Sequence, residues 1–249
     1  MPFSRVSTVG PLLAAVLFSF ASSSPAQDGA PEGPTSTTPA PREQAGSIAR
    51  QDECIRRVRE SGPTRVLFVG DSITQSWEGP GRQVWAEKIA PLGALNLGNS
   101  GDRTEHVLWR LEQAPLTRLA PEHIVLLIGT NNLGHGTSNA AETLAGIVEV
   151  ARTLAAQCPE ATIHILEILP RGERFNAMRG DILQINQALR AFVAAENAGG
   201  RARFDTHALG DRFVNPDGSI PRELMPDFLH LTPSGYGIWA DAIVPELSG

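Results

Sequence analysis

The stretch Arg65-Val66-Leu67-Phe68-Val69-Gly70-Asp71-Ser72-Ile73-Thr74 decides the fold. Its four consecutive apolar residues, two of them β-branched, predict a strand that is buried on both faces. Gly70 permits a tight turn, and Asp71 or Ser72 can then cap a helix. Polar residues at the carboxyl end of a parallel strand lie where open α/β sheets bind ligands. Gly-Asp-Ser is also an ordinary turn sequence, so this stretch alone leaves a purely structural role open.

Strand-like and helix-like segments alternate along the rest of the chain. Further strands are expected at residues 92–97, 123–128, 162–169 and 203–205. The main helices are expected at residues 43–60, 104–113, 139–157, 178–197 and 236–244. This alternation predicts an α/β fold of three layers, with a five-stranded parallel sheet in the flavodoxin-like order 2-1-3-4-5. Because polar loops follow the first three strands, those loops should lie together at one edge of the sheet.

Composition limits the function classes. The chain has 249 residues, of which 41% are hydrophobic, which suits one sizeable core. The net charge of −6, without a basic run, argues against a nucleic-acid partner. No HExxH pattern or His/Cys cluster at ligand spacing occurs, so neither a metal nor another cofactor is expected.

The N-terminal region is typical of an exported protein. Residues 1–26 have a basic start, an apolar run at 9–20 and small residues up to Ala26, which predicts a cleaved signal peptide. The apolar run is too short for an ordinary membrane span, although an uncleaved anchor is the alternative. Residues 27–42 are rich in Pro, Thr, Ser, Ala and Gly and predict a flexible linker before a folded domain at 43–249. We therefore expect a secreted or periplasmic protein.

The chain has two cysteines, Cys54 and Cys158. In an oxidising compartment they could form a disulfide, but two buried free thiols on two helices fit equally well. The sequence leaves this choice open.

Ester hydrolysis by a serine requires a base near the hydroxyl and a group that orients the base. Ser72 is the candidate nucleophile, and His230, directly before the last helix, is the best candidate base. Asp227 lies three residues earlier, where a tight turn would bring it to the same side and let it fix the imidazole tautomer. A loop turn with a helix cap is the structural alternative. The other histidines have weaker claims, and of them only His135, in the loop after Asn131, is a candidate for substrate contact.

Three groups are candidates for binding the oxyanion of the reaction. They are the backbone N–H of Ser72, the backbone N–H of Gly101 and the side-chain amide of Asn131. Gly and Asn are common in loops for conformational reasons, so each is weak evidence alone. Their positions after consecutive strands give them weight together.

Four short blocks carry a family resemblance: Gly70-Asp71-Ser72-Ile73, Gly101-Asp102, Gly129-Thr130-Asn131-Asn132 and Asp227-Phe228-Leu229-His230. In this order and spacing they resemble the blocks of the SGNH (GDSL-type) hydrolase family. The stretches at 107–111, 169–173 and 228–232 are similar to those of the platelet-activating-factor acetylhydrolase catalytic-subunit group. The resemblance covers about residues 65–247, most of the expected mature chain.

The resemblance implies a flavodoxin-like fold and hydrolysis of small acyl esters without a metal. It implies Ser72 as nucleophile, Gly101 and Asn131 as oxyanion donors, and Asp227 with His230 as the remaining catalytic residues. Asp71 should be structural. The relatives also suggest a homodimer.

Substrate contacts are less well defined. Ile73, Thr130 and Leu229 flank the site residues and either line a small acyl pocket or pack beside the loops. The motif departs from the family pattern at Ile73, where Leu is usual, and at 99–101, where a glycine-richer loop is usual in the similar group. These departures leave the shape of the acyl pocket open.

The sequence thus predicts a secreted serine esterase for short, most simply acetyl, esters. The substrate is either an acetylated polysaccharide or a small lipid-like ester. Acyl transfer to a sugar and a catalytically silent carbohydrate-binding module are the alternatives.

Overall fold

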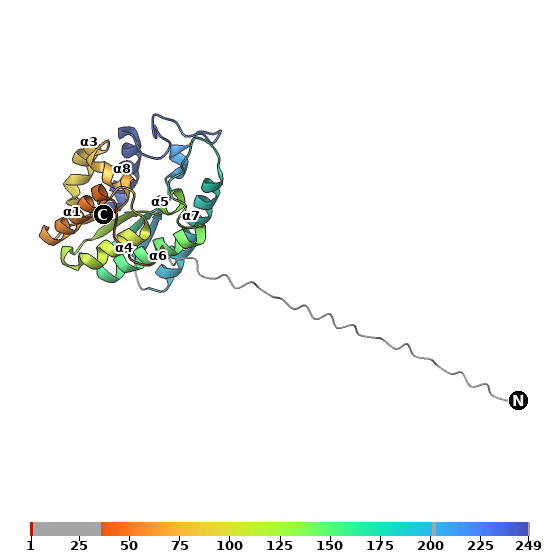
Figure 1. Cartoon of the computed structure of the whole chain (residues 1–249), viewed down its shortest axis with the longest axis horizontal. Coiled ribbons are helices and arrows are strands. Elements are labelled where there is room, and N and C mark those ends of the chain that lie inside the picture. The colour runs from red at the N-terminus through yellow and green to blue at the C-terminus, as the bar shows by residue number, and fades with distance from the viewer. Residues whose placement is uncertain (2–35, 201–202, 249) are drawn as a thin grey trace. The chain divides into compact units, whose positions relative to one another are not determined.

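The computed structural model describes Met1, residues 36–200 and residues 203–248. The expected signal peptide, its cleavage point and the first part of the expected linker lie outside these residues, apart from Met1. Figure 1 shows the arrangement of the helices and strands.

Five parallel strands form a single sheet. They are β1 (Val66–Gly70), β2 (Ala94–Asn96), β3 (His123–Leu127), β4 (Thr162–Leu166) and β5 (Arg203–His207). Their order is β2-β1-β3-β4-β5, which confirms the predicted topology. In register, Phe68 of β1 lies opposite Asn96 of β2 and Val125 of β3.

Helices cover both faces of this sheet. Alternate residues of each strand point to opposite faces, so each strand contributes side chains to two cores. Leu67 and Val69 belong to a core with α1 (Ala45–Glu60), α4 (Thr104–Gln113), α6 (Ala140–Gln157) and α7 (Ala177–Ala198). Val66 and Phe68 belong to a second core with α8 (Pro233–Leu247) and the segment from α2 (Ser72–Gln75) to η3 (Ala90–Leu92). The remaining short elements are η1 (Ser76–Glu78), α3 (Arg82–Val84), η2 (Trp85–Ile89), η4 (Leu116–Leu119), α5 (Thr130–Gly134) and η5 (Gly210–Phe213).

An aromatic cluster fills the second core. The Phe68 ring lies 6.1 Å from that of Trp77, 5.1 Å from that of Trp85 and 6.1 Å from that of Trp239. These contacts attach α8 to the elements that directly follow Ser72. The turn after β1 therefore rests on a rigid base, and α3 and α8 lie side by side in Figure 1.

The fourth strand is shorter than the sequence predicts. It ends at Leu166, whereas the apolar run continues to Leu169. The backbone leaves the sheet pairing because Ile168 N–H donates to Oδ1 of Asn186 on α7, at 2.9 Å. Buried residues beyond a strand end cannot be distinguished from strand residues by hydropathy alone.

The folded domain begins earlier than residue 43, so that predicted boundary is wrong. Ser36 is 5% exposed, and its hydroxyl donates to the carbonyl of Glu142 at 2.6 Å. Its own carbonyl accepts from the Thr104 hydroxyl at 2.7 Å, and Ala40 N–H donates to the Glu105 carbonyl at 3.1 Å. The segment has few apolar side chains, so its composition suggested a linker. It nevertheless packs against the domain, through hydroxyl and backbone groups.

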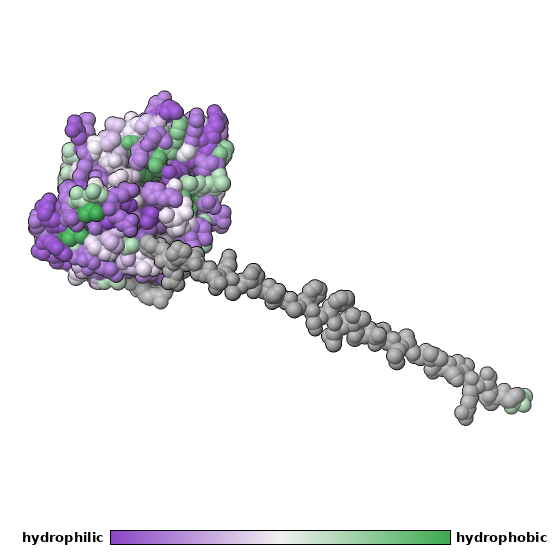
Figure 2. All heavy atoms as spheres, in the orientation of Figure 1, coloured by the Kyte–Doolittle hydropathy of each residue, from purple (hydrophilic) through white to green (hydrophobic). Residues whose placement is uncertain are grey.

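Both cysteines are free and buried. Cys54 lies on α1 and Cys158 directly follows α6, and burial raises the pKa of the Cys158 thiol to about 11. None of the described helices combines the length and apolar character that a membrane crossing requires. Figure 2 shows one face of the molecule, on which hydrophilic side chains predominate and hydrophobic ones form small separate groups.

Candidate active site

Ser72 is the first residue of α2, at the carboxyl end of β1. Gly70 makes this turn possible, since a Cβ there would lie 2.3 Å from both the Leu127 carbonyl oxygen and the Thr74 hydroxyl. Asp71 is fully buried and caps α2, because its Oδ1 accepts from the N–H of Ile73 at 2.9 Å. Ser72 itself is 8% exposed. The turn thus places the Ser72 hydroxyl at the carboxyl end of β1 with a small exposed surface.

Burial also changes the ionisation of Asp71. Loss of solvent raises the pKa of Asp71 to about 7, although the Ile73 N–H and the charges of His230 and Arg171 act in the opposite direction. A buried carboxyl group with a raised pKa is consistent with the structural role expected for Asp71.

The turn before α8 brings His230 to Ser72. The Ser72 Oγ lies 2.9 Å from His230 Nε2, and His230 Nδ1 lies 2.7 Å from Asp227 Oδ2. The carboxylate therefore holds the proton on Nδ1, which leaves Nε2 free to accept from the serine hydroxyl. The two side chains of the predicted Asp-x-x-His pair and the predicted serine lie in one hydrogen-bonded chain.

Backbone groups fix the Asp227 carboxylate. Its Oδ1 accepts from the N–H of Leu229 at 3.1 Å and of His230 at 2.8 Å. Partial burial acts to raise the pKa of Asp227, but the hydrogen bonds from His230 and Leu229 outweigh it and hold this pKa below its ordinary value. Phe228, between Asp227 and Leu229, has φ of 59°, a left-handed conformation that a bulky residue rarely adopts. The strain is local to the turn that aims the imidazole.

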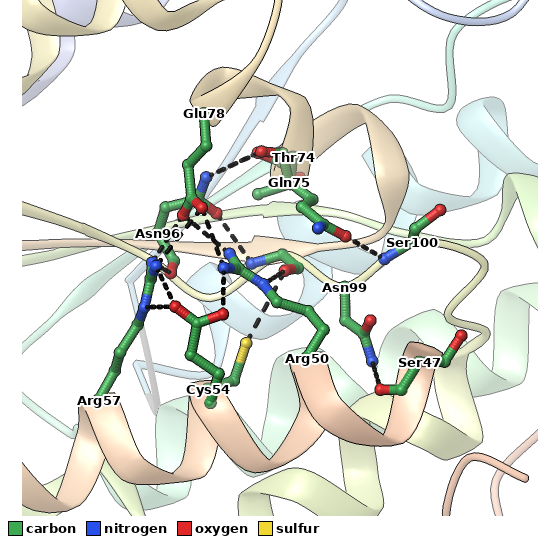
Figure 3. Close-up of polar contacts among 12 residues, drawn as sticks. Ser47, Arg50, Cys54, Arg57, Thr74, Gln75, Glu78, Asn96, Asn99 and Ser100 are labelled. Carbon is green, nitrogen blue, oxygen red and sulfur yellow. Dashed lines mark hydrogen bonds and ion pairs between the residues drawn. The ribbon is translucent and has the colours of Figure 1, made fainter. Parts of the chain in front are cut away.

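The loop that carries Gly101 is bonded to the serine turn. Asn99 N–H donates to the Gly70 carbonyl at 3.1 Å, and Ser100 N–H donates to Oε1 of Gln75 at 2.7 Å. Gly101 has φ of +75°, which an L side chain would resist. Figure 3 shows Ser100 and Gln75 bonded to each other, with Asn99 directed to Ser47 on α1.

Asn131 lies in the first turn of α5 and connects to the same loop. Its Nδ2 donates to the Asp102 carbonyl at 2.9 Å. Because a primary amide carries two N–H bonds, one remains for a ligand. The structure therefore links the three candidate oxyanion donors, Ser72, Gly101 and Asn131, through adjoining loops.

Charged side chains beneath these loops were missed in the sequence. The Asp102 carboxylate is fully buried and forms an ion pair with Arg110, whose guanidinium also donates to the Leu97 carbonyl at 3.1 Å. Arg42 Nη1 donates to the Gly101 carbonyl at 2.6 Å, and its Nε lies 3.9 Å from Asp102 Oδ1. Asp102 and Arg110 lie in stretches that carry the family resemblance, although their pairing was not predicted. The only signal for Arg42 was an Arg in a region whose composition is typical of a linker.

The four residues expected to contact the substrate differ in their exposure to solvent. Ile73 is 1% exposed and packs in the second core, so it presents no surface to a ligand. Thr130 is buried, and its carbonyl and hydroxyl accept from Arg171 Nη1 at 2.9 and 3.2 Å. Leu229 is half-buried at the edge of the same core. His135 is exposed and lines a separate cleft next to Gly101.

Within residues 36–200 and 203–248, no group of three or more His, Cys, Asp or Glu side chains is placed to hold an ion.

Comparison with known proteins identifies the family. The model of the GDSL-like lipase/acylhydrolase family matches residues 68–238. Human platelet-activating factor acetylhydrolase IB subunit alpha1 is 39% identical over 171 residues, which cover 69% of this chain and 70% of that protein. The human alpha2 subunit is 41% identical over 172 residues, with the same shares.

The chain belongs to the GDSL-like lipase/acylhydrolase family. It is an esterase-type enzyme of that family. The region that the family model matches begins at residue 68, so Ser36 and Arg42 lie upstream of it.

Solved structures show the same GDSL-type fold. A GDSL-like lipase from Bacteroides thetaiotaomicron has a TM-score of 0.61 at 22% identity and covers 80% of this chain and 97% of its own. A carbohydrate esterase family 3 protein from Talaromyces cellulolyticus has a TM-score of 0.55 at 16% identity, covering 74% and 96%.

Proposed function

We propose that this GDSL-family esterase is exported and hydrolyses short-chain acyl esters, acetyl esters foremost, through a Ser72 acyl-enzyme. One observation carries the proposal: the hydrogen-bonded chain from Ser72 Oγ through His230 to Asp227, with steps of 2.9 and 2.7 Å. Relatives about 40% identical are named acetylhydrolases, which favours acetyl as the acyl group. The basic, apolar and small-residue pattern of residues 1–26 supports export.

In the first step, Ser72 Oγ attacks the acyl carbon while His230 Nε2 takes the hydroxyl proton. The negative charge on the former carbonyl oxygen is stabilised by the N–H groups of Ser72 and Gly101 and by the free N–H of Asn131. Asp227 stabilises the imidazolium. The ester C–O bond then breaks, and the alcohol leaves with the proton from His230.

In the second step, a water molecule replaces the alcohol. His230 Nε2 takes a proton from this water as its oxygen attacks the acyl-enzyme. The bond to Ser72 breaks, the proton returns to Ser72 Oγ, and the carboxylic acid leaves. The same three side chains therefore serve both steps.

A short acyl group fits the surroundings of the nucleophile. Ser72 is 8% exposed, and Ile73 on α2 and Thr130 and Asn131 at the start of α5 are all buried. Arg171 holds Thr130 in place from behind. We therefore expect short acyl groups to be preferred over long ones.

Replacement of the nucleophile tests the proposal. We expect Ser72→Ala to lower kcat for 4-nitrophenyl acetate by about 10⁴-fold or more and to abolish labelling by a fluorophosphonate probe. Rates on 4-nitrophenyl acetate, butyrate and octanoate should fall as the acyl chain lengthens. Ser248→Ala, which removes a hydroxyl bonded only to the Val244 carbonyl, should change neither readout. An active, folded Ser72→Ala protein would overturn the assignment.

A further inference from the structure

A cleft lies beside the loop that carries Gly101. It is a polar cleft of about 500 Å³, and its lining includes Arg42, Ser47, Ser100, Gly101, Arg103 and His135. These residues come from the segment before α1, the first turn of α1, the loop after β2 and the end of α5. Gly101 therefore belongs both to the candidate oxyanion site and to this cleft.

The chemistry of the lining is basic. Among the described residues that line the cleft, Glu43 is the single carboxylate, against two guanidinium and two imidazole groups. Arg103 pairs with Glu105 and keeps a side chain that is 20% exposed. Burial, and then the charges of Arg103, Arg42 and Arg171, hold the pKa of His135 below its ordinary value.

Arg42 connects the cleft to the site. Its guanidinium donates to the Gly101 carbonyl at 2.6 Å and to the Ser47 hydroxyl at 2.8 Å, and the side chain is 8% exposed. The guanidinium is thus fixed as part of the wall. Arg103 and His135 keep exposed surface, so they are the groups available to a ligand.

The described lining contains no Phe, Tyr or Trp ring and no Leu, Ile, Val or Met side chain. It offers neither a face for stacking a sugar nor a surface for an alkyl chain. Arginine forks and imidazole N–H groups instead match the oxygens of a carboxylate or phosphate. An ester that reaches from Ser72 past Gly101 would bring its alcohol portion into this environment.

We propose that the cleft binds an anionic group, a carboxylate or a phosphate, on the alcohol portion of the ester, with Arg103 and His135 as its contacts. The proposal rests on the function assigned to Ser72 and adds a substrate class to it. The preferred substrates are then acyl esters of acidic alcohols.

Two matched pairs of substrates separate the sources of the anion. Acetylated polygalacturonate against acetylated xylan tests a carboxylate, and 1-acetylglycerol 3-phosphate against 1-acetylglycerol tests a phosphate. The wild-type protein should have a higher kcat/KM for the anionic member of at least one pair. Raising the salt concentration should reduce that preference, because the charges are partly exposed.

Variants then assign the preference to the cleft. We expect Arg103→Gln to lower the ratio of anionic to neutral kcat/KM by about tenfold or more, and Arg103→Lys to retain part of it. His135→Gln should lower the ratio by a few-fold, and it remains informative if Arg103→Gln does not fold. Arg118→Gln removes a positive charge from η4, which precedes β3 at the opposite edge of the sheet, and should leave the ratio unchanged.

The outcomes distinguish the two proposals. Equal rates for the anionic and neutral members of both pairs, or an unchanged ratio in folded Arg103→Gln and His135→Gln proteins, overturn the anion cleft. Either result alongside an inactive Ser72→Ala protein leaves the esterase assignment intact. Activity in Ser72→Ala overturns the esterase mechanism itself.

Discussion

Two chains of hydrogen-bonded side chains in this protein have a histidine at their centre. In one, His230 lies between Ser72 and Asp227, at 2.9 and 2.7 Å. In the other, His164 on β4 lies between His123 on β3 and His207 on β5, at 3.0 Å on each side. The distances are similar, but the chemistry that the two chains permit differs.

The difference lies in the partners and in exposure. The His230 side chain is 39% exposed and has a carboxylate on Nδ1, which can stabilise an imidazolium. His164 is 2% exposed between two imidazoles, and burial together with His207 and His123 lowers its pKa to about 3. The buried imidazole of His164 resists protonation, whereas an imidazole between a carboxylate and a hydroxyl can accept a proton. Hydrogen bonding to a histidine is therefore not enough to make it a base.

The Asp227 carboxylate is the feature whose removal should have the largest effect. We expect Asp227→Asn to lower kcat by about 10⁴-fold with little change in KM, because the amide would stabilise the wrong imidazole tautomer and no imidazolium. Steady-state kinetics with 4-nitrophenyl acetate measures this. Asp205→Asn is the matched control, since that carboxylate lies 4.0 Å from His164 in the other chain. Activity near the wild-type level in Asp227→Asn would remove the contrast between the two chains.

The second difference between the two chains is the set of candidate oxyanion donors near Ser72. The histidine row contains no nucleophile, so no oxyanion would form beside it. Asn131→Ala removes one oxyanion donor and should lower kcat by about 10²–10³-fold while Ser72 still reacts with a fluorophosphonate. The amide also bonds the Asp102 carbonyl, so circular dichroism and thermal unfolding should accompany the kinetics. If kcat is unchanged in a folded Asn131→Ala protein, the oxyanion is bound elsewhere.

The histidine row should affect stability rather than rate. In the unfolded chain His164 binds a proton below about pH 6.5, whereas in the folded protein it stays neutral down to about pH 3. Its contribution is therefore fully present above pH 6.5 and is lost as the pH falls between these values, at up to about 1.4 kcal/mol per pH unit. Urea unfolding of His164→Gln at several pH values should show a shallower decline than that of the wild type. Parallel curves would show that the row does not resist protonation.

Local sequence patterns predicted most of what lies in a single turn or strand. The Gly70-Asp71-Ser72 turn, the Asp227/His230 pair and the parallel sheet order all follow from short-range spacing and periodicity. The pairing of Ser72 with His230, 158 positions apart, was expected from the Asp-x-x-His spacing before the last helix and from the family resemblance.

Features that depend on long-range packing could not be predicted in this way. The segment 36–42 has the composition of a linker, yet Arg42 bonds the Gly101 carbonyl across 59 positions. Ile73 follows the nucleophile in sequence, yet it packs in the core because the first turn of α2 directs it under α8.

The sequence by itself determined the order of the strands and the identities of the reactive groups, because backbone periodicity and turn chemistry are local. Only the tertiary structure decided that residues 36–42 pack against the domain, that Ile73 is buried in the core, and which arginines line the cleft beside Gly101. The physical reason is that burial and charge at any one residue are set by side chains that folding brings from distant parts of the chain.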